Sequence, residues 1–121
     1  LTVNFFMYAA ASGGSPITYA DNGSTVYLEN TSTNTTVGTV TYEVDWGDTT
    51  TTAIASDSAA GGVSGSRLAH TYTNSAGDDG STIGTGSGDT RYTVKLKLLS
   101  HTTADPAEIP KTQSKNFDVY S

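Results

Sequence analysis

Apolar and polar side chains alternate most clearly in a segment that ends at the only tryptophan of the chain. Between 40 and 46 every second residue is apolar, and the last of these is Trp46. A period of two is typical of a strand with one buried face. Gly47 and Asp48 follow directly, and both residue types favour tight turns. We therefore expect a central strand that buries Trp46 in the core and then reverses the chain.

Similar alternation predicts strands at 2–8, 25–30, 67–73 and 91–99, and weaker patterns predict extended segments at 17–19, 49–55 and 117–120. The segments between them are rich in Gly, Ser, Thr and Asp, and the longest, 74–89, is expected to be a structureless loop. About seven strands joined by turns predict an all-β, two-sheet antiparallel sandwich with almost no helix. The expected shared core is Val26, Leu28, Tyr42, Trp46, Tyr92, Val94, Leu96 and Leu98.

The first predicted strand has apolar residues on both faces. Val3, Phe5 and Met7 point to one side, and Phe6 points to the other. A strand of this kind is expected to be covered by the core on one side and by a neighbouring domain or subunit on the other. Phe6 is therefore a candidate binding residue for a protein partner.

Composition excludes several classes of function. A chain of 121 residues is expected to form one domain with a core of its own. A net charge of −6, with few and scattered cations, does not fit a nucleic-acid binder, and the longest apolar run, 5–11, is too short to cross a membrane. The chain starts without a basic, apolar leader, so we expect a mature or excised piece whose targeting signal lay outside it.

Metal binding is one candidate chemistry, and calcium is the ion to consider. Two histidines and no cysteine leave too few ligands for structural zinc. Two Gly-rich loops carry the carboxylates that Ca²⁺ prefers: the candidate metal ligands are Asp78, Asp79 and Asp89 in one loop, and Asp45, Asp48 and Asp57 flank the other. Neither loop has EF-hand spacing with its closing Glu, so solvated acidic loops that bind no cofactor are the preferred interpretation, and calcium is the alternative.

Catalysis and glycan binding are weaker hypotheses. The candidate acids Glu29, Glu43 and Glu108 lie far apart in the sequence, and no feature pairs them. A carbohydrate-binding module needs exposed aromatic rings. Three tyrosines off the core register are candidates for that role: Tyr8, Tyr27 and Tyr120.

Three asparagines begin formal glycosylation sequons: Asn22, Asn30 and Asn34. In so Thr-rich a chain, these matches are better explained by turns that Asn and Thr side chains stabilise.

Four blocks of the sequence together resemble the PKD domain, an immunoglobulin-like β-sandwich. They are Val26-x-Leu28-x-Asn30-x-Ser32, Val44-Asp-Trp46-Gly-Asp48, His70-Thr-Tyr72 and Tyr92-Thr-Val94-Lys-Leu96, and they span 26–98 in the family's order. The resemblance implies a structural role for Trp46, Gly47, Asp48, His70, Tyr72 and Tyr92. We expect Asp48 to cap the turn through backbone N–H groups, and His70 and Tyr72 to orient their strand toward it rather than to act chemically.

Three departures from the family pattern accompany this resemblance. Thr49 replaces the last glycine of the family's Gly-Asp-Gly turn, so the turn need not take a positive φ there. Val44 stands where an aromatic residue is usual, and the loop 74–89 is longer than in the family. These departures affect functions that the loops would carry more than they affect the expected fold.

The resemblance implies a non-catalytic module on an extracellular, cell or virion surface that spaces, presents or adheres. Its expected partners are protein neighbours in a larger assembly or repeat array. The alternative is a carbohydrate-binding accessory module of a secreted protein.

Overall fold

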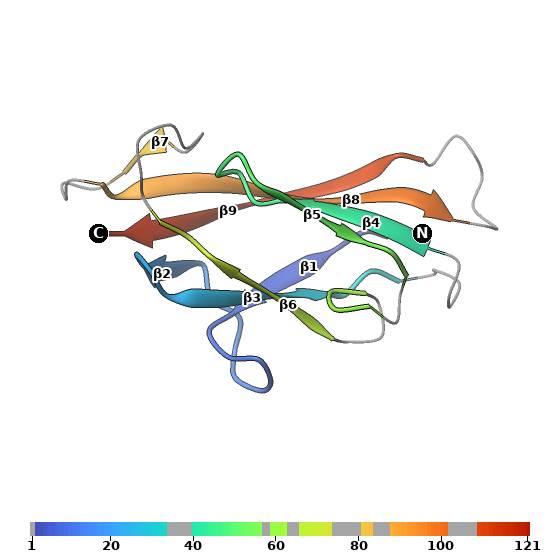
Figure 1. The fold of residues 1–121 in the computed structure, drawn as a ribbon, viewed down its shortest axis with the longest axis horizontal. Coiled ribbons are helices and arrows are strands. Elements are labelled where there is room, and N and C mark those ends of the chain that lie inside the picture. Colours follow the sequence, from blue (N-terminus) through green and yellow to red (C-terminus); the bar gives the residue numbers. More distant parts are fainter. Residues whose placement is uncertain are drawn as a thin grey trace.

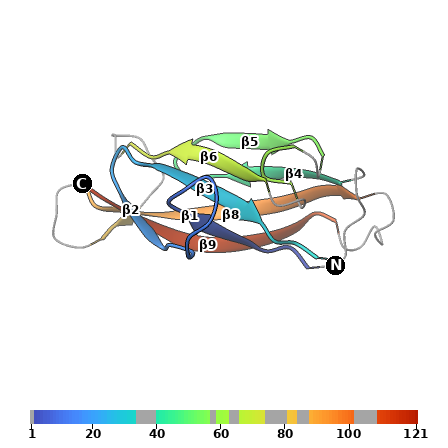
Figure 2. The same cartoon turned by 90° about the horizontal axis from the view of Figure 1, so that it is seen from below.

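In the computed structural model the chain forms two packed β-sheets (Figures 1 and 2). The structure describes residues 2–33, 40–56, 59–62, 66–73, 81–83, 88–101 and 109–121. Its strands are β1 (Phe5–Tyr8), β2 (Tyr19–Asp21), β3 (Thr25–Asn30), β4 (Val40–Asp45), β5 (Thr51–Ile54), β6 (Arg67–Thr71), β7 (Ser81–Thr82), β8 (Thr90–His101) and β9 (Lys111–Tyr120). There is no helix in these ranges, which confirms the all-β prediction for the described part of the chain.

The smaller sheet has the order β1-β3-β6, and the larger has the order β2-β9-β8-β4-β5, with β7 also paired to β8. All pairs are antiparallel except β2 with β9, which is parallel. The chain therefore passes from the smaller sheet to the larger between β1 and β2, and returns at β3. The first and last described residues lie at opposite ends of the long axis (Figures 1 and 2).

Both sheets contribute to one apolar core. All eight predicted core residues are buried, and Trp46, Leu28 and Tyr92 are fully inaccessible. Alternation explains this result, because β4 and β8 each place every second side chain inward. Each large apolar side chain buried in this way contributes on the order of 1.5–3 kcal/mol.

Four features of the sheets differ from the prediction, and the first is the parallel pairing of β2 with β9 in a sandwich expected to be antiparallel. The described residues form nine strands rather than about seven, and the segment 74–89 contains β7. The last strand begins at Lys111 rather than near Phe117. Its polar first half pairs with β8 from Lys95 to Leu98. Backbone hydrogen bonds to a long neighbouring strand hold this segment extended, so no apolar period is needed there.

Candidate functional site

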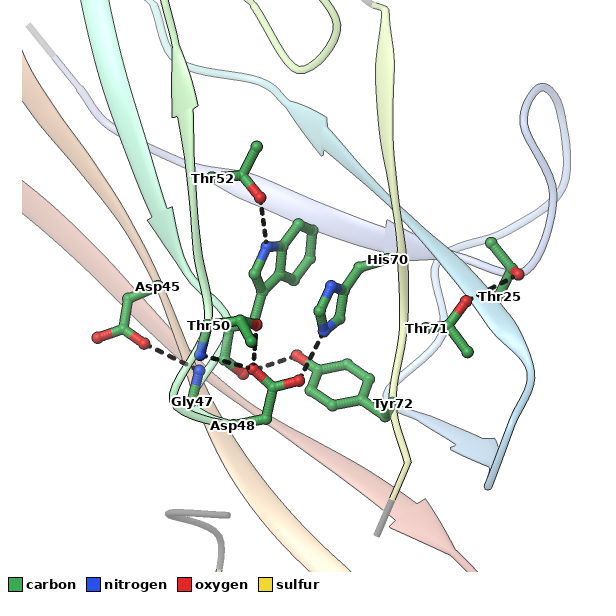
Figure 3. A network of polar contacts seen from close by, with 10 residues as sticks. Thr25, Asp45, Gly47, Asp48, Thr50, Thr52, His70, Thr71 and Tyr72 are labelled. Carbon is green, nitrogen blue, oxygen red and sulfur yellow. Dashed lines mark hydrogen bonds and ion pairs between the residues drawn. The ribbon is translucent and has the colours of Figure 1, made fainter. Parts of the chain in front are cut away.

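The most elaborate polar cluster lies where β4 ends, and we call it the Trp46 corner: Trp46, Asp48, Thr50, His70 and Tyr72 (Figure 3). The chain turns between β4 and β5, and the Trp46 N–H donates to the Thr50 carbonyl at 3.1 Å. The indole Nε1 donates to Thr52 Oγ1 at 3.0 Å, so the buried ring has its polar atom paired. The backbone and the indole of Trp46 are therefore both hydrogen-bonded to residues that follow the turn.

The carboxylate of Asp48 joins the turn to the opposite sheet. It is 8% exposed, and it accepts hydrogen bonds from the backbone N–H of Thr50 at 3.2 Å and from the Thr50 hydroxyl. Its second oxygen lies 2.8 Å from His70 Nε2, on β6 of the smaller sheet. The prediction that Asp48 caps the turn is confirmed, and His70 proves to be the partner that crosses between the sheets.

His70 and Tyr72 both face the turn, as expected. The His70 ring stacks on Trp46 with a centroid distance of 4.3 Å and an interplanar angle of 5°. The Tyr72 hydroxyl donates to the Trp46 carbonyl at 2.7 Å. Burial, reinforced by the negative charge of Asp48, raises the pKa of Tyr72 far above that of a free phenol. Tyr72 is therefore a neutral hydrogen-bond donor, and it also stacks on Tyr92 at 4.7 Å.

Two residues of the turn have a positive φ. Gly47 has φ 84°, and a Cβ there would lie 2.6 Å from the Thr93 carbonyl oxygen of β8, so only glycine fits. Thr49 also has a positive φ, 72°, and it is the only non-glycine residue in the described ranges that does. The absence of glycine at this position left a positive φ unnecessary, but the turn adopts one at Thr49 all the same.

The Asp–His pair of the corner differs in arrangement from the pair in a serine hydrolase. In a serine hydrolase, the imidazole would link the carboxylate to a nucleophilic hydroxyl. Here the only hydroxyl bound to Asp48 in the described part of the chain is that of Thr50, and it binds the carboxylate itself. The pair connects the turn after β4 to β6 of the smaller sheet.

The calcium ligands predicted from the sequence are only partly within the described residues. Asp78, Asp79 and Asp57 lie outside them. Asp89 accepts hydrogen bonds from the backbone N–H and hydroxyl of Ser121 at 2.9 and 3.1 Å, and Asp45 accepts one from the Gly47 N–H at 2.9 Å. No group of three potential metal ligands occurs in the ranges that the structure describes.

Of the candidate acids, the two that the structure describes are not brought together. Glu29 on β3 pairs with Arg67 at 3.3 Å, and Glu43 on β4 pairs with Lys97 at 3.7 Å, so they lie on different sheets. Glu108 lies outside the described residues.

Two of the sequons lie within the described chain. Asn30 is 2% exposed, and its side-chain oxygen accepts from the Ser32 N–H at 3.0 Å, which is the predicted turn chemistry. Asn22 is exposed in the turn after β2, and Asn34 is outside the description.

The aromatic residues proposed for binding are separated. Phe6 (37% exposed) and the half-buried Tyr27 are on the smaller sheet, whereas Tyr120 (36% exposed) is on β9 of the larger one. Tyr8 is only 9% exposed, with the Arg67 guanidinium 3.6 Å from its ring centroid, so it cannot serve as an exposed platform.

The most exposed aromatic ring, Tyr19 at 61%, was missed by the sequence reasoning. Its edge contacts Tyr120 with a centroid distance of 6.0 Å. Its only sequence signal was a tyrosine in a short segment with no clear period.

Comparison with known proteins adds no assignment. No protein-family model, no curated protein and no solved structure matches this chain. The described ranges also contain no helix of the length and apolarity needed to span a bilayer.

Proposed function

We propose that this chain is a non-catalytic, PKD-like module of the immunoglobulin-like class that binds protein neighbours on an extracellular, cell or virion surface. The carrying observation is Phe6, an aromatic side chain 37% exposed on β1, at the edge of the smaller sheet. Aromatic residues are enriched in protein interfaces relative to the rest of the surface. Its position agrees with a first strand that is apolar on both faces.

Strand order supports the immunoglobulin-like part of the proposal. In that class, strands A, B and E share one sheet and strands C, F and G share the other. Here β1, β3 and β6 correspond to strands A, B and E in the smaller sheet. In the larger sheet, β4, β8 and β9 correspond to strands C, F and G. The Trp46 corner adds residues from two of the four blocks on which the PKD resemblance rests.

The surroundings of Phe6 support a role in contact. Lys115 of β9 lies 3.7 Å from the Phe6 ring centroid, and its ammonium group donates to the Phe5 carbonyl. The ring is thereby held in place, so it loses less side-chain entropy on binding than a free ring would. The opposite positions of the two chain ends also favour a module that spaces its neighbours along a line (Figures 1 and 2).

Mass photometry and size exclusion of the isolated domain, alone and mixed with its parent assembly, test the proposal. We expect the domain to bind the assembly and Phe6→Ser to weaken this binding about tenfold, which corresponds to a residue contributing roughly 1.4 kcal/mol. Leu99→Ser is the matched control, because Leu99 is 44% exposed on β8, away from β1.

Thermal unfolding of both variants shows whether they are folded. A folded monomer that does not bind its parent assembly would contradict the proposal. Equal binding by wild type and Phe6→Ser would exclude Phe6 as the contact.

A further inference from the structure

The outward face of the short strand β2 carries an aromatic ring and a carboxylate side by side. Tyr19 and Asp21 are two residues apart, so both side chains point away from the core, whereas Ala20 between them packs against it. Residues two apart in an extended strand have their Cα atoms about 6.5 Å apart. Tyr19 is 61% exposed, and Asp21 is exposed as well. Neither the Trp46 corner nor Phe6 uses this face.

The neighbouring strand β9 supports the Tyr19 ring. In the parallel β2–β9 pair, Asp118 lies opposite Tyr19. Tyr120 lies opposite Asp21, so all four side chains share the outer face of the larger sheet. The rings of Tyr19 and Tyr120 meet at 77° with their centroids 6.0 Å apart. Because this contact restricts the Tyr19 ring, the ring loses less side-chain entropy on binding than an isolated one would.

The outer face of the β2–β9 pair carries one carboxylate that is neutralised and one that is not. Arg91 of β8 donates two hydrogen bonds to Asp118, from Nε to Oδ1 at 2.7 Å and from Nη2 to Oδ2 at 3.0 Å. This pair has no net charge. The Asp21 side chain has no hydrogen-bond or ion-pair partner within the described residues. Together with the net charge of −6 of the whole chain, Asp21 favours a cationic partner at this face.

The smaller sheet shows how a tyrosine and a carboxylate of this protein together hold an arginine. Tyr8 of β1 and Glu29 of β3 are diagonal neighbours on its outer face, a relation that places residues about 7–8 Å apart. The Arg67 guanidinium lies 3.6 Å from the centroid of the Tyr8 ring, and its Nε donates to Glu29 at 3.3 Å. A guanidinium can meet both groups at once, because its flat face stacks while its N–H groups point outward in its plane. Tyr19 and Asp21 have a similar spacing.

We propose that Tyr19 and Asp21 bind an arginine side chain that a protein neighbour supplies. The guanidinium stacks on the exposed Tyr19 ring and donates to the Asp21 carboxylate. Arginine fits this pair better than lysine does, since an ammonium is a compact, strongly hydrated charge with no flat face. Arg67 also donates to two carbonyls of the segment before β2, so the external contact is weaker than the internal one. The proposal does not depend on the function proposed above.

NMR titration with three capped tripeptides tests the proposal. Each has one arginine, lysine or citrulline between two glycines, and each is added to about 50 mM at constant ionic strength, because an exposed ion pair and cation–π contact bind weakly. We expect the arginine peptide to shift the resonances of Tyr19, Asp21 and Tyr120 and to bind at least about threefold more tightly than the lysine peptide. Citrulline has the shape of arginine without its charge and should not bind.

Substitutions separate the two parts of the contact. Tyr19→Leu keeps an apolar side chain but removes the aromatic face, and it should weaken arginine binding about two- to fivefold. Asp21→Asn should weaken it by about the same factor. Phe6→Leu is the control for the ring, because it makes a comparable change on the other sheet. Glu43→Gln is the control for charge, because it removes one carboxylate from β4 of the larger sheet. Both controls should bind like wild type.

Thermal unfolding shows whether each variant is folded. The proposal is overturned if the arginine peptide does not shift these resonances, or if the lysine or citrulline peptide binds as tightly. Wild-type affinity in Tyr19→Leu or in Asp21→Asn also overturns it, and if Tyr19→Leu does not fold, Asp21→Asn decides alone. An equal loss in Glu43→Gln and Asp21→Asn overturns it as well, since net charge alone would then explain the attraction.

Discussion

Replacing Thr49 with glycine should stabilise the protein, although it removes a side chain. Thr49 is exposed and has φ 72°, in the left-handed region. This conformation costs an L-residue about 1–2 kcal/mol relative to glycine, and more for a β-branched one. Glycine loses roughly 0.5–1 kcal/mol more entropy on folding, which offsets part of the gain. The net expectation is an increase of about 0.5–1 kcal/mol in the free energy of unfolding.

Urea denaturation and thermal unfolding measure this increase, and the melting temperature should rise by about 2–5 °C. Two controls separate conformation from side-chain loss. Thr49→Ala removes the same hydroxyl and methyl groups but keeps most of the strain, so it should gain little. Thr51→Gly places glycine in the exposed strand β5 and should destabilise. If Thr49→Gly is no more stable than Thr49→Ala, the strain argument is wrong.

Two further predictions concern the same corner. Gly47→Ala puts an L-residue in the left-handed region and places its Cβ 2.6 Å from the Thr93 carbonyl oxygen. Urea denaturation should therefore show a decrease of about 2–4 kcal/mol in the free energy of unfolding. A decrease of less than about 1 kcal/mol would show that β8 can move aside. Tyr72→Phe leaves the Trp46 carbonyl without its donor and should cost about 1–3 kcal/mol at neutral pH. Because folding raises the Tyr72 pKa above 10.0, its contribution is fully present below pH 10 and is lost as pH rises further, by up to about 1.4 kcal/mol per pH unit. A series of unfolding curves from pH 9 to 11 should therefore fall less steeply for Tyr72→Phe than for wild type, and equal slopes would contradict the assignment.

Alternation of apolar residues was sufficient to predict the core and most strands. The segments around Tyr42 and Val94 show it clearly, because both faces of each strand have distinct surroundings. The partners of Trp46 were also predictable in kind, since the PKD resemblance implied structural roles for Asp48, His70 and Tyr72. Their assembly across two sheets needed the structure.

Other features left no local signal. The first half of β9 is polar and is extended because β8 beside it is long. The exposure of Tyr19 depends on the parallel pairing of β2 with β9, which a three-residue strand does not reveal. The φ of Thr49 is imposed by the closure of the β4–β5 turn, against the preference of threonine itself.

The parallel pairing of β2 with β9 has a mechanical consequence. Asp118 N–H donates to the Thr18 carbonyl at 3.0 Å and Asn22 N–H donates to the Tyr120 carbonyl at 2.7 Å, one at each end of the pair. In a parallel pair, tension on the start of one strand and the end of the other pulls them past each other along their length. All the hydrogen bonds between them then share the load and break together rather than one by one. Tension carried between the start of β2 and the end of β9 would therefore load this pair in shear.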